Sequence, residues 1–252
     1  MGGKLDRERA RTLVEPHWRR VYNFVFRLSL DHERAERYVA EVFAAAADQL
    51  HARPAAEADA LVWLLAVATQ VLDSRLPRQP EVNFDILDET LRSEATRTDV
   101  VRSLTDPQRD LLLWELKQGC MTAVINCLSP GERVAFVLAA VLGKTEEQAA
   151  QSLGIKTSAF KVRLSRAKKK IGDYLAPRCE HVDARNPCRC PSRIGVALKK
   201  GFIAPPQTAV VQLRTPSKSY TEELKSRDAV GIFRTLPSVE IPDTLRTRLA
   251  QL

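Results

Sequence analysis

The sequence lacks a hydrophobic run long enough to cross a membrane. Its longest apolar runs, residues 60–68 and 134–142, span nine residues each, whereas a transmembrane helix needs about 20. The first ten residues are polar and contain no apolar core of the kind that a secretory signal needs. These absences exclude an integral membrane protein and predict a cytoplasmic protein without a membrane partner.

Cysteines and aromatic residues are also scarce. Five cysteines in a chain expected to stay in the cytoplasm argue against a disulfide framework and favour buried thiols or metal ligands. Aromatic residues make up 6% of the chain, a low share that is typical of helix-rich proteins built on Leu, Val and Ala. Neither a strand-period segment nor an internal repeat stands out, so the sequence predicts an all-α fold.

Basic residues, by contrast, are in excess. The chain has 39 Lys and Arg against 31 Asp and Glu, which gives a net charge of +8. Such a balance favours a polyanionic partner over an acidic substrate. With 252 residues, the chain is long enough for two compact domains and a linker or tail.

The N-terminal third has helical periodicity. Apolar residues at steps of three and four predict helices over about residues 8–29, 31–50 and 61–76, with prolines ending the third helix. We therefore predict a first helical domain over residues 8–78. A polar linker over residues 79–105 follows, and within it a short helix is expected at about residues 89–104.

The next segment, residues 106–176, contains strong helix start and stop signals. Ser129 and Glu132 form one predicted capping box, and Thr145 and Gln148 form another. Gly143 ends the helix between them, and Gly154 ends a second helix of only two turns. A longer helix then runs from about residue 157 to residue 175, which gives the order of a helix-turn-helix domain.

That longer helix has a cationic surface. Seven of the residues from Lys156 to Ile171 are basic and none is acidic, whereas Phe160, Leu164, Ala167 and Ile171 are predicted to face inward. The candidate DNA-binding residues are Lys156, Thr157, Ser158, Lys161, Arg163, Arg166 and Lys168, with Lys161 and Arg163 favoured as base readers. A solvated basic helix that only aids solubility is the alternative.

The segment LSPGERVAFVLAAVLGKTEEQAAQSLGIKTSAFKVRLSRAKKKI resembles the C-terminal domain of the extracytoplasmic-function (ECF) sigma factors of bacterial RNA polymerase. The segments VYNFVFRLSLDHERAERYVAEVFAAAADQL and LVWLLAVATQVLDSRL are similar to the N-terminal helices of the same family. The resemblance implies that the helix-turn-helix binds the promoter minus-thirty-five element. It also implies that the N-terminal domain binds core RNA polymerase and melts the minus-ten element.

Carried over by position, the resemblance places the polymerase-binding helix at Glu36, Arg37, Ala40 and Glu41, and the promoter-melting helix at residues 63–75. Family members usually have Asp at the position of Arg37 and Gln at that of Ala40. The melting helix also has Ala66, Thr69 and Gln70 where basic and Asn residues are usual. Trp63 is either a base-stacking residue or part of the core.

The partners implied by the resemblance are bacterial core RNA polymerase and promoter DNA, with an anti-sigma factor as a further candidate. Such a protein performs no covalent chemistry and is not an enzyme. The alternative is a stand-alone helix-turn-helix regulator that binds an operator without polymerase, and the residues at positions 37 and 40 favour it.

A Cys/His cluster follows the helix-turn-helix, in residues 177–203. Cys179, His181, Cys188 and Cys190 supply the ligand types of a tetrahedral zinc site. Structural zinc, a metal-sensing or redox-sensing switch, and a segment without metal remain open. A zinc enzyme is disfavoured because these four ligands would fill every coordination position.

Two further predictions concern the cysteines. Four nearby arginines are expected to lower the pKa of the cluster thiols: Arg178, Arg185, Arg189 and Arg193. Cys120 and Cys127 are interpreted as buried core thiols outside the cluster. Beyond the cluster, a helix is expected over about residues 192–200. A tail over residues 204–252 contains a further helix from Ser219, and our hypothesis is that residues 178–252 form a regulatory extension.

Overall fold

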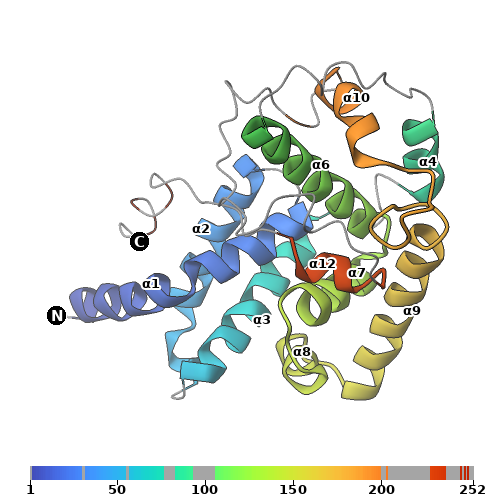
Figure 1. Cartoon of the computed structure of the whole chain (residues 1–252). Helices are drawn as coiled ribbons and strands as arrows, with labels where there is room; N and C mark the ends of the chain where they lie inside the picture. Colours follow the sequence, from blue (N-terminus) through green and yellow to red (C-terminus); the bar gives the residue numbers. More distant parts are fainter. Residues whose placement is uncertain are drawn as a thin grey trace. The chain divides into compact units, whose positions relative to one another are not determined.

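The computed structural model describes residues 2–29, 32–54, 57–76, 83–92, 106–199, 203, 228–236, 245, 247 and 249. Helices dominate these residues, and the only β-type pairing among them is an isolated bridge between Cys179 and Cys188 (Figure 1). The predicted all-α fold class is therefore confirmed. None of the described helices has both the length and the hydrophobicity that crossing a membrane requires.

The chain divides into two compact units. The first consists of Met1–Arg78, Val134–Leu164 and Ile241–Leu252, and the second of Gln79–Arg133 and Ser165–Glu240. The divisions fall inside two helices of the helix-turn-helix segment. The domain boundaries expected from the sequence stay a prediction.

Three long helices form the centre of the first unit. They are α1 (Gly2–Ser29), α2 (His32–Asp48) and α3 (Glu57–Arg75), and they pack against one another. A 3-10 turn, η1 (Leu50–Ala52), ends the α2 segment. The three predicted helices are confirmed, because their apolar stripes are buried: Val21, Val25, Leu28, Val39, Val42, Leu64, Leu65 and Ala68 are at most 1% exposed.

The helix-turn-helix elements follow the predicted start and stop signals. Helix α7 (Pro130–Phe136) continues into a π-helical segment, η2 (Val137–Val141), and α8 (Glu146–Ser152) and α9 (Thr157–Leu175) follow. Gly143 and Gly154, which end two of these helices, have φ angles of +65° and +61°, a conformation that glycine adopts without steric cost. Within the first unit, α8 packs against α3.

The capping box at the start of α8 is present as predicted. Thr145 Oγ1 accepts a hydrogen bond from the Gln148 backbone N–H at 3.2 Å, and Gln148 Oε1 accepts one from the Thr145 N–H at 3.3 Å. Two backbone N–H groups that the helix itself leaves without a partner are thereby satisfied. The short helix α8 therefore has a fixed starting point.

The second unit is built around α6 (Asp106–Asn126), with α4 (Phe84–Arg92), η3 (Cys190–Arg193), α10 (Ile194–Lys199) and α12 (Gly231–Arg234). One hydrophobic cluster joins α6 to the segment after the Cys/His loop: Leu112, Leu113 and Trp114 pack with Ile194, Ala197 and Ile203. The helix expected over residues 192–200 is thus present as η3 and α10. Ile194, Ala197 and Ile203 are therefore part of the core of this unit.

The linker helix begins earlier than expected. Helix α4 covers residues 84–92, whereas the sequence predicted a helix over about residues 89–104. Asn83 explains the difference, because its Oδ1 accepts a hydrogen bond from the Ile86 backbone N–H at 2.8 Å and thereby caps the helix. Residues 93–105 and the helix expected from Ser219 lie outside the described residues.

Candidate functional site

Helix α9 separates a buried stripe from an exposed basic surface. Phe160, Ala167 and Ile171 are fully buried and Leu164 is 4% exposed, as the sequence predicted. Of the seven candidate DNA-binding residues, Lys156, Ser158, Lys161, Arg163, Arg166 and Lys168 are exposed, and Thr157 is half-buried. The structure thus presents all seven on or beside α9, where a polyanion can approach them.

Three lysines of α9 form ion pairs with acidic side chains. Lys161 Nζ lies 3.3 Å from Glu146 Oε2 of α8, and Lys169 Nζ lies 2.6 Å from Asp173 Oδ2 one turn further along α9. All four side chains are more than 40% exposed. Because solvent and salt screen such exposed pairs, these contacts are weak enough to exchange for phosphate contacts.

The third pair is more buried. Lys170 Nζ donates to both carboxylate oxygens of Glu132, at 3.0 and 2.7 Å, and the Glu132 side chain is only 9% exposed. Burial alone would raise the pKa of Glu132, but hydrogen bonds from Lys170 and Ser129 lower it below the ordinary value. Lys170 therefore serves the packing of the second unit, unlike Lys168.

The predicted polymerase-binding residues lie outside the buried stripe of α2. Arg37 is exposed, with its guanidinium carbon 5.3 Å from the centroid of the Tyr38 ring, and Glu36 and Ala40 are half-buried. Glu41 accepts a hydrogen bond from Arg75 Nε at 3.0 Å. This face thus combines one exposed residue, Arg37, with three half-buried ones, of which Glu41 is tied to α3.

The predicted melting helix, α3, presents few groups that could hold a single strand. Trp63 and Ala66 are half-buried, Gln70 is exposed, and the Thr69 hydroxyl donates back to the Leu65 carbonyl at 2.7 Å. Trp63 is therefore neither fully in the core nor fully open to solvent. Its base-stacking role stays a prediction.

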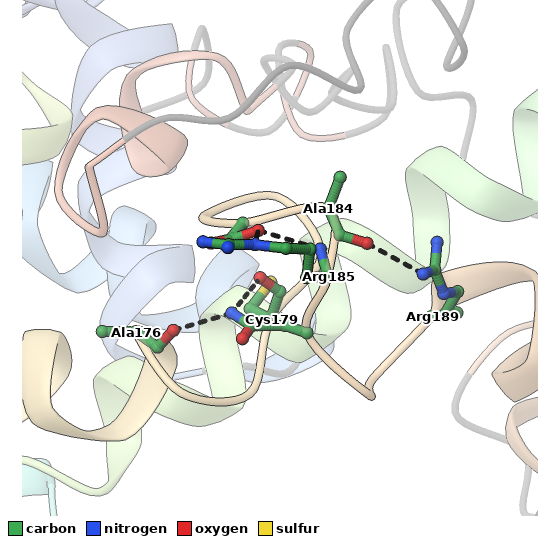
Figure 2. Close-up of polar contacts among 7 residues, drawn as sticks. Ala176, Cys179, Ala184, Arg185 and Arg189 are labelled. Atoms are coloured by element: carbon green, nitrogen blue, oxygen red, sulfur yellow. Dashed lines mark hydrogen bonds and ion pairs between the residues drawn. The ribbon is translucent and has the colours of Figure 1, made fainter.

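The Cys/His loop after α9 is held by side-chain hydrogen bonds (Figure 2). Asn186 Nδ2 donates to the carbonyl oxygens of Ala176 and Cys179, at 2.7 and 2.9 Å, and Arg189 Nη2 donates to the Ala184 carbonyl at 2.8 Å. The backbones of Cys179 and Cys188 are joined by the bridge described above. The loop is therefore a defined structure rather than an open tail.

Within this loop, three side chains converge as a metal site would require. One potential ligand atom each from Glu180, His181 and Cys190 lies within 4.8 Å of the others, and this is the group of that kind found among the described residues. Cys190 Sγ lies 3.7 Å from His181 Nε2. His181 and Cys190 were predicted ligands. Glu180 was not predicted, because a single glutamate in a polar loop does not differ in sequence from an ordinary surface residue.

The four ligands predicted from the sequence and Cys120 line one cavity. The cavity has a volume of about 460 Å³ within the second unit, and its walls include Cys120, Cys179, Cys188 and Cys190 as well as His181. Cys120 comes from α6, some sixty residues before the other thiols, and is half-buried. Cys120 therefore borders the cavity that the predicted ligands line, whereas Cys127 is buried and does not line it.

The expectation that arginines lower the thiol pKa values is also wrong. Burial raises the pKa of Cys179 to about 11, and the pKa values of Cys120 and Cys188 are raised for the same reason. The arginines are engaged elsewhere: Arg178 binds both Asp88 carboxylate oxygens at 2.9 Å, and Arg185 pairs with Asp183. Arg193 lowers the pKa of Cys188, but by less than burial raises it.

Comparison with known proteins agrees with the geometry. Residues 118–171 match the family described as Sigma-70, region 4. The chain is also 24% identical over 165 residues to the ECF RNA polymerase sigma factor SigE of Mycolicibacterium smegmatis. This alignment covers 65% of the present chain and 60% of the relative. The resemblance to ECF sigma factors found in the sequence is therefore confirmed.

Proposed function

We propose that this protein, which carries a sigma-70 region 4 domain, is an ECF sigma factor that binds core RNA polymerase and directs it to particular promoters. The observation that carries the proposal is the exposed basic surface of α9 within the matched region. The second half of α9 adds no acidic residue before Asp173. Such a surface suits the phosphates of duplex DNA in the major groove.

Recognition of the minus-thirty-five element is assigned to the start of α9. Lys156, Thr157 and Ser158 stand where the helix begins, and Lys161, Arg163, Arg166 and Lys168 continue along its exposed sides. Arginine and lysine at such positions bind phosphates and guanine edges, whereas the hydroxyl groups bind phosphates or bases. The function requires binding and positioning of DNA and no covalent step.

Polymerase binding is assigned to Glu36, Arg37, Ala40 and Glu41 of α2. Their place outside the buried stripe supports this assignment, since a partner can reach them without unfolding the helix. Arg37 brings a positive charge to a position where the resemblance implies an Asp. The polymerase surface that meets it is therefore expected to carry a complementary acidic group.

The test is co-purification of the full chain with bacterial core RNA polymerase, followed by run-off transcription from a promoter of the source genome. A sigma factor forms the complex and initiates at a defined start site. Replacing Arg37 by Glu should weaken the complex, whereas replacing Arg34, which is exposed on the same helix, serves as the charge-matched control. Binding to DNA without any polymerase association would instead identify a stand-alone regulator.

We further propose that the Glu180, His181 and Cys190 cluster holds zinc. Oxygen, nitrogen and sulfur donors are all zinc ligands, and the buried carboxylate and imidazole here meet a thiol within bonding range of a common ion. Cys179 and Cys188 line the same cavity and are the candidates for a fourth ligand. Bound zinc would link two parts of the loop, because Glu180 and Cys190 are ten residues apart in sequence.

Zinc content of the purified full chain tests this assignment. Wild type and Cys127→Ser should contain one zinc per chain, whereas His181→Ala and Cys190→Ser should lose it. Cys127 is the matched control because it is a buried cysteine that does not line the cavity. Absence of zinc from wild type after growth and purification with added zinc would reject the assignment.

The regulatory role of residues 178–252 also stays a proposal. Its structural support is the hydrophobic cluster that ties Ile194, Ala197 and Ile203 to α6. Deleting the whole extension would expose Leu112, Leu113 and Trp114, so loss of activity after deletion would not separate regulation from unfolding. His181→Ala is the sharper variant, with promoter-directed transcription measured with and without zinc and oxidant. Output equal to wild type in every condition would reject a regulatory role.

A further inference from the structure

An exposed valine lies on the basic helix α9. Val162 is 50% exposed, and Ile86 is the only other large apolar side chain of the described residues that is exposed. Its neighbours in sequence, Lys161 and Arg163, are charged and exposed. Packing within the described part of the chain therefore does not account for a large apolar side chain at position 162, between two cations.

Helix geometry puts Val162 at the middle of the outward surface. Phe160 and Leu164 are buried, and each is two residues from Val162, which is about 200° around the helix axis. Lys161 and Arg163 are about 100° from Val162 and therefore lie at the two sides. Four exposed residues lie about one turn from Val162 on the same outward side: Ser158, Ala159, Ser165 and Arg166.

A recognition helix that enters the major groove turns its central line toward the base edges and its sides toward the two phosphate backbones. The chemistry around Val162 matches that division, because three of its four exposed neighbours one turn away are small (Ser158, Ala159 and Ser165) and the cations Lys161 and Arg163 occupy the sides. In the major groove, the apolar feature of a base pair is the thymine C5-methyl group. The valine side chain carries two methyl groups and can neither donate nor accept a hydrogen bond.

We propose that Val162 reads a thymine in the DNA element through contact with its C5-methyl group. This inference rests on the proposed DNA-binding function of α9 and adds to it a specificity residue. It also changes the roles of Lys161 and Arg163, which the sequence favoured as base readers: their lateral positions suit phosphates. Ser158 and Ser165 would line the groove on either side of the contact.

The experiment uses duplexes selected from a random pool by the full chain, alone and bound to bacterial core RNA polymerase. Each thymine of the selected element is replaced in turn by deoxyuridine, which lacks only the methyl group. Wild type should lose affinity at one or two positions, by about fourfold for each buried methyl group. Val162→Ser should show no such loss there, whereas Val162→Ile should keep it.

The outcomes separate this inference from the function on which it rests. If Val162→Ser responds to deoxyuridine as wild type does, or if no thymine methyl affects wild-type binding, the inference is overturned while DNA binding stands. If no duplex is enriched by either form of the protein, both are overturned. Circular dichroism of the variants verifies folding, which should be unchanged because the side chain is exposed.

Discussion

The ammonium group of Lys170 lies between the two carboxylate oxygens of Glu132, 38 residues away in sequence. Glu132 Oε2 also accepts a hydrogen bond from the Ser129 backbone N–H at 3.3 Å, which is one half of the predicted capping box. One carboxylate therefore fixes the start of α7 and the second half of α9 at once. Both partners belong to the second unit.

Loss of this contact should reduce stability. Lys170→Ala is expected to lower the free energy of unfolding by about 1 kcal/mol, since it leaves a nearly buried carboxylate without its cation while Lys170 itself is half exposed. Urea unfolding followed by circular dichroism measures the change. Lys168→Ala is the control, and an equal loss in both variants would contradict the assigned role of Lys170.

The same contact should make stability depend on pH. The pKa of Glu132 is lowered in the folded protein, so its contribution is complete above the unfolded value of about 4.3 and is lost as the pH falls through the lowered folded value. The stability difference between wild type and Glu132→Gln should be constant from about pH 5 to pH 8 and shrink below that range. A difference that grows on acidification would contradict the sign.

Two ion pairs should differ in value because one is both more buried and bidentate. Arg178 binds Asp88 through two hydrogen bonds of 2.9 Å, with side chains 35% and 17% exposed, whereas Lys169 and Asp173 are 75% and 65% exposed. Asp88→Asn is expected to cost about 1 kcal/mol and Asp173→Asn less than about 0.5 kcal/mol in thermal unfolding. Equal effects would mean that neither burial nor the second hydrogen bond adds to the stability of the Arg178–Asp88 pair.

The capping box of α8 should contribute measurably to stability. Thr145→Ala removes the acceptor for the Gln148 N–H and is expected to lower the free energy of unfolding by about 1 kcal/mol. Ser165→Ala, at an exposed position inside α9, should change it by less than about 0.5 kcal/mol. Denaturant titration of both variants makes the comparison, and the reverse order would show that α8 does not depend on its cap.

Lys168 and Lys170 should differ in DNA binding as well as in stability. Lys168→Ala should weaken binding to all duplexes alike and lower the slope of log affinity against log salt by about 0.9, the effect of one lost phosphate contact. Lys170→Ala should change the slope less, because its ammonium group already binds Glu132. Fluorescence anisotropy at several salt concentrations gives both slopes. Equal slopes would place both lysines on phosphate.

Helix positions could be predicted from the sequence because their causes are local. The apolar spacing of residues 8–76 and the buried stripe of α9 follow from a period of 3.6 residues. The cap of α8 is local as well, because Thr145 binds the backbone N–H of Gln148, three residues away. The one shifted helix, α4, has a local cause too: Asn83 is its cap. The exposed cations of α9 could be predicted for the same reason, since they lie on a single helix.

Contacts between distant parts of the chain were decided by the tertiary structure. The sequence pointed to cysteines around residues 179–190, but only the fold brings Cys120 of α6 to the same cavity and turns Glu180 toward Cys190 and His181. The thiol pKa values followed the burial of the side chains and the partners of the arginines, not the nearness of arginines in sequence. In the sequence Lys170 is one more cation in the basic run of α9, and only the fold places Glu132 beside it. Sequence spacing specifies which side of a helix a residue occupies, whereas burial and long-range partners depend on how the helices pack.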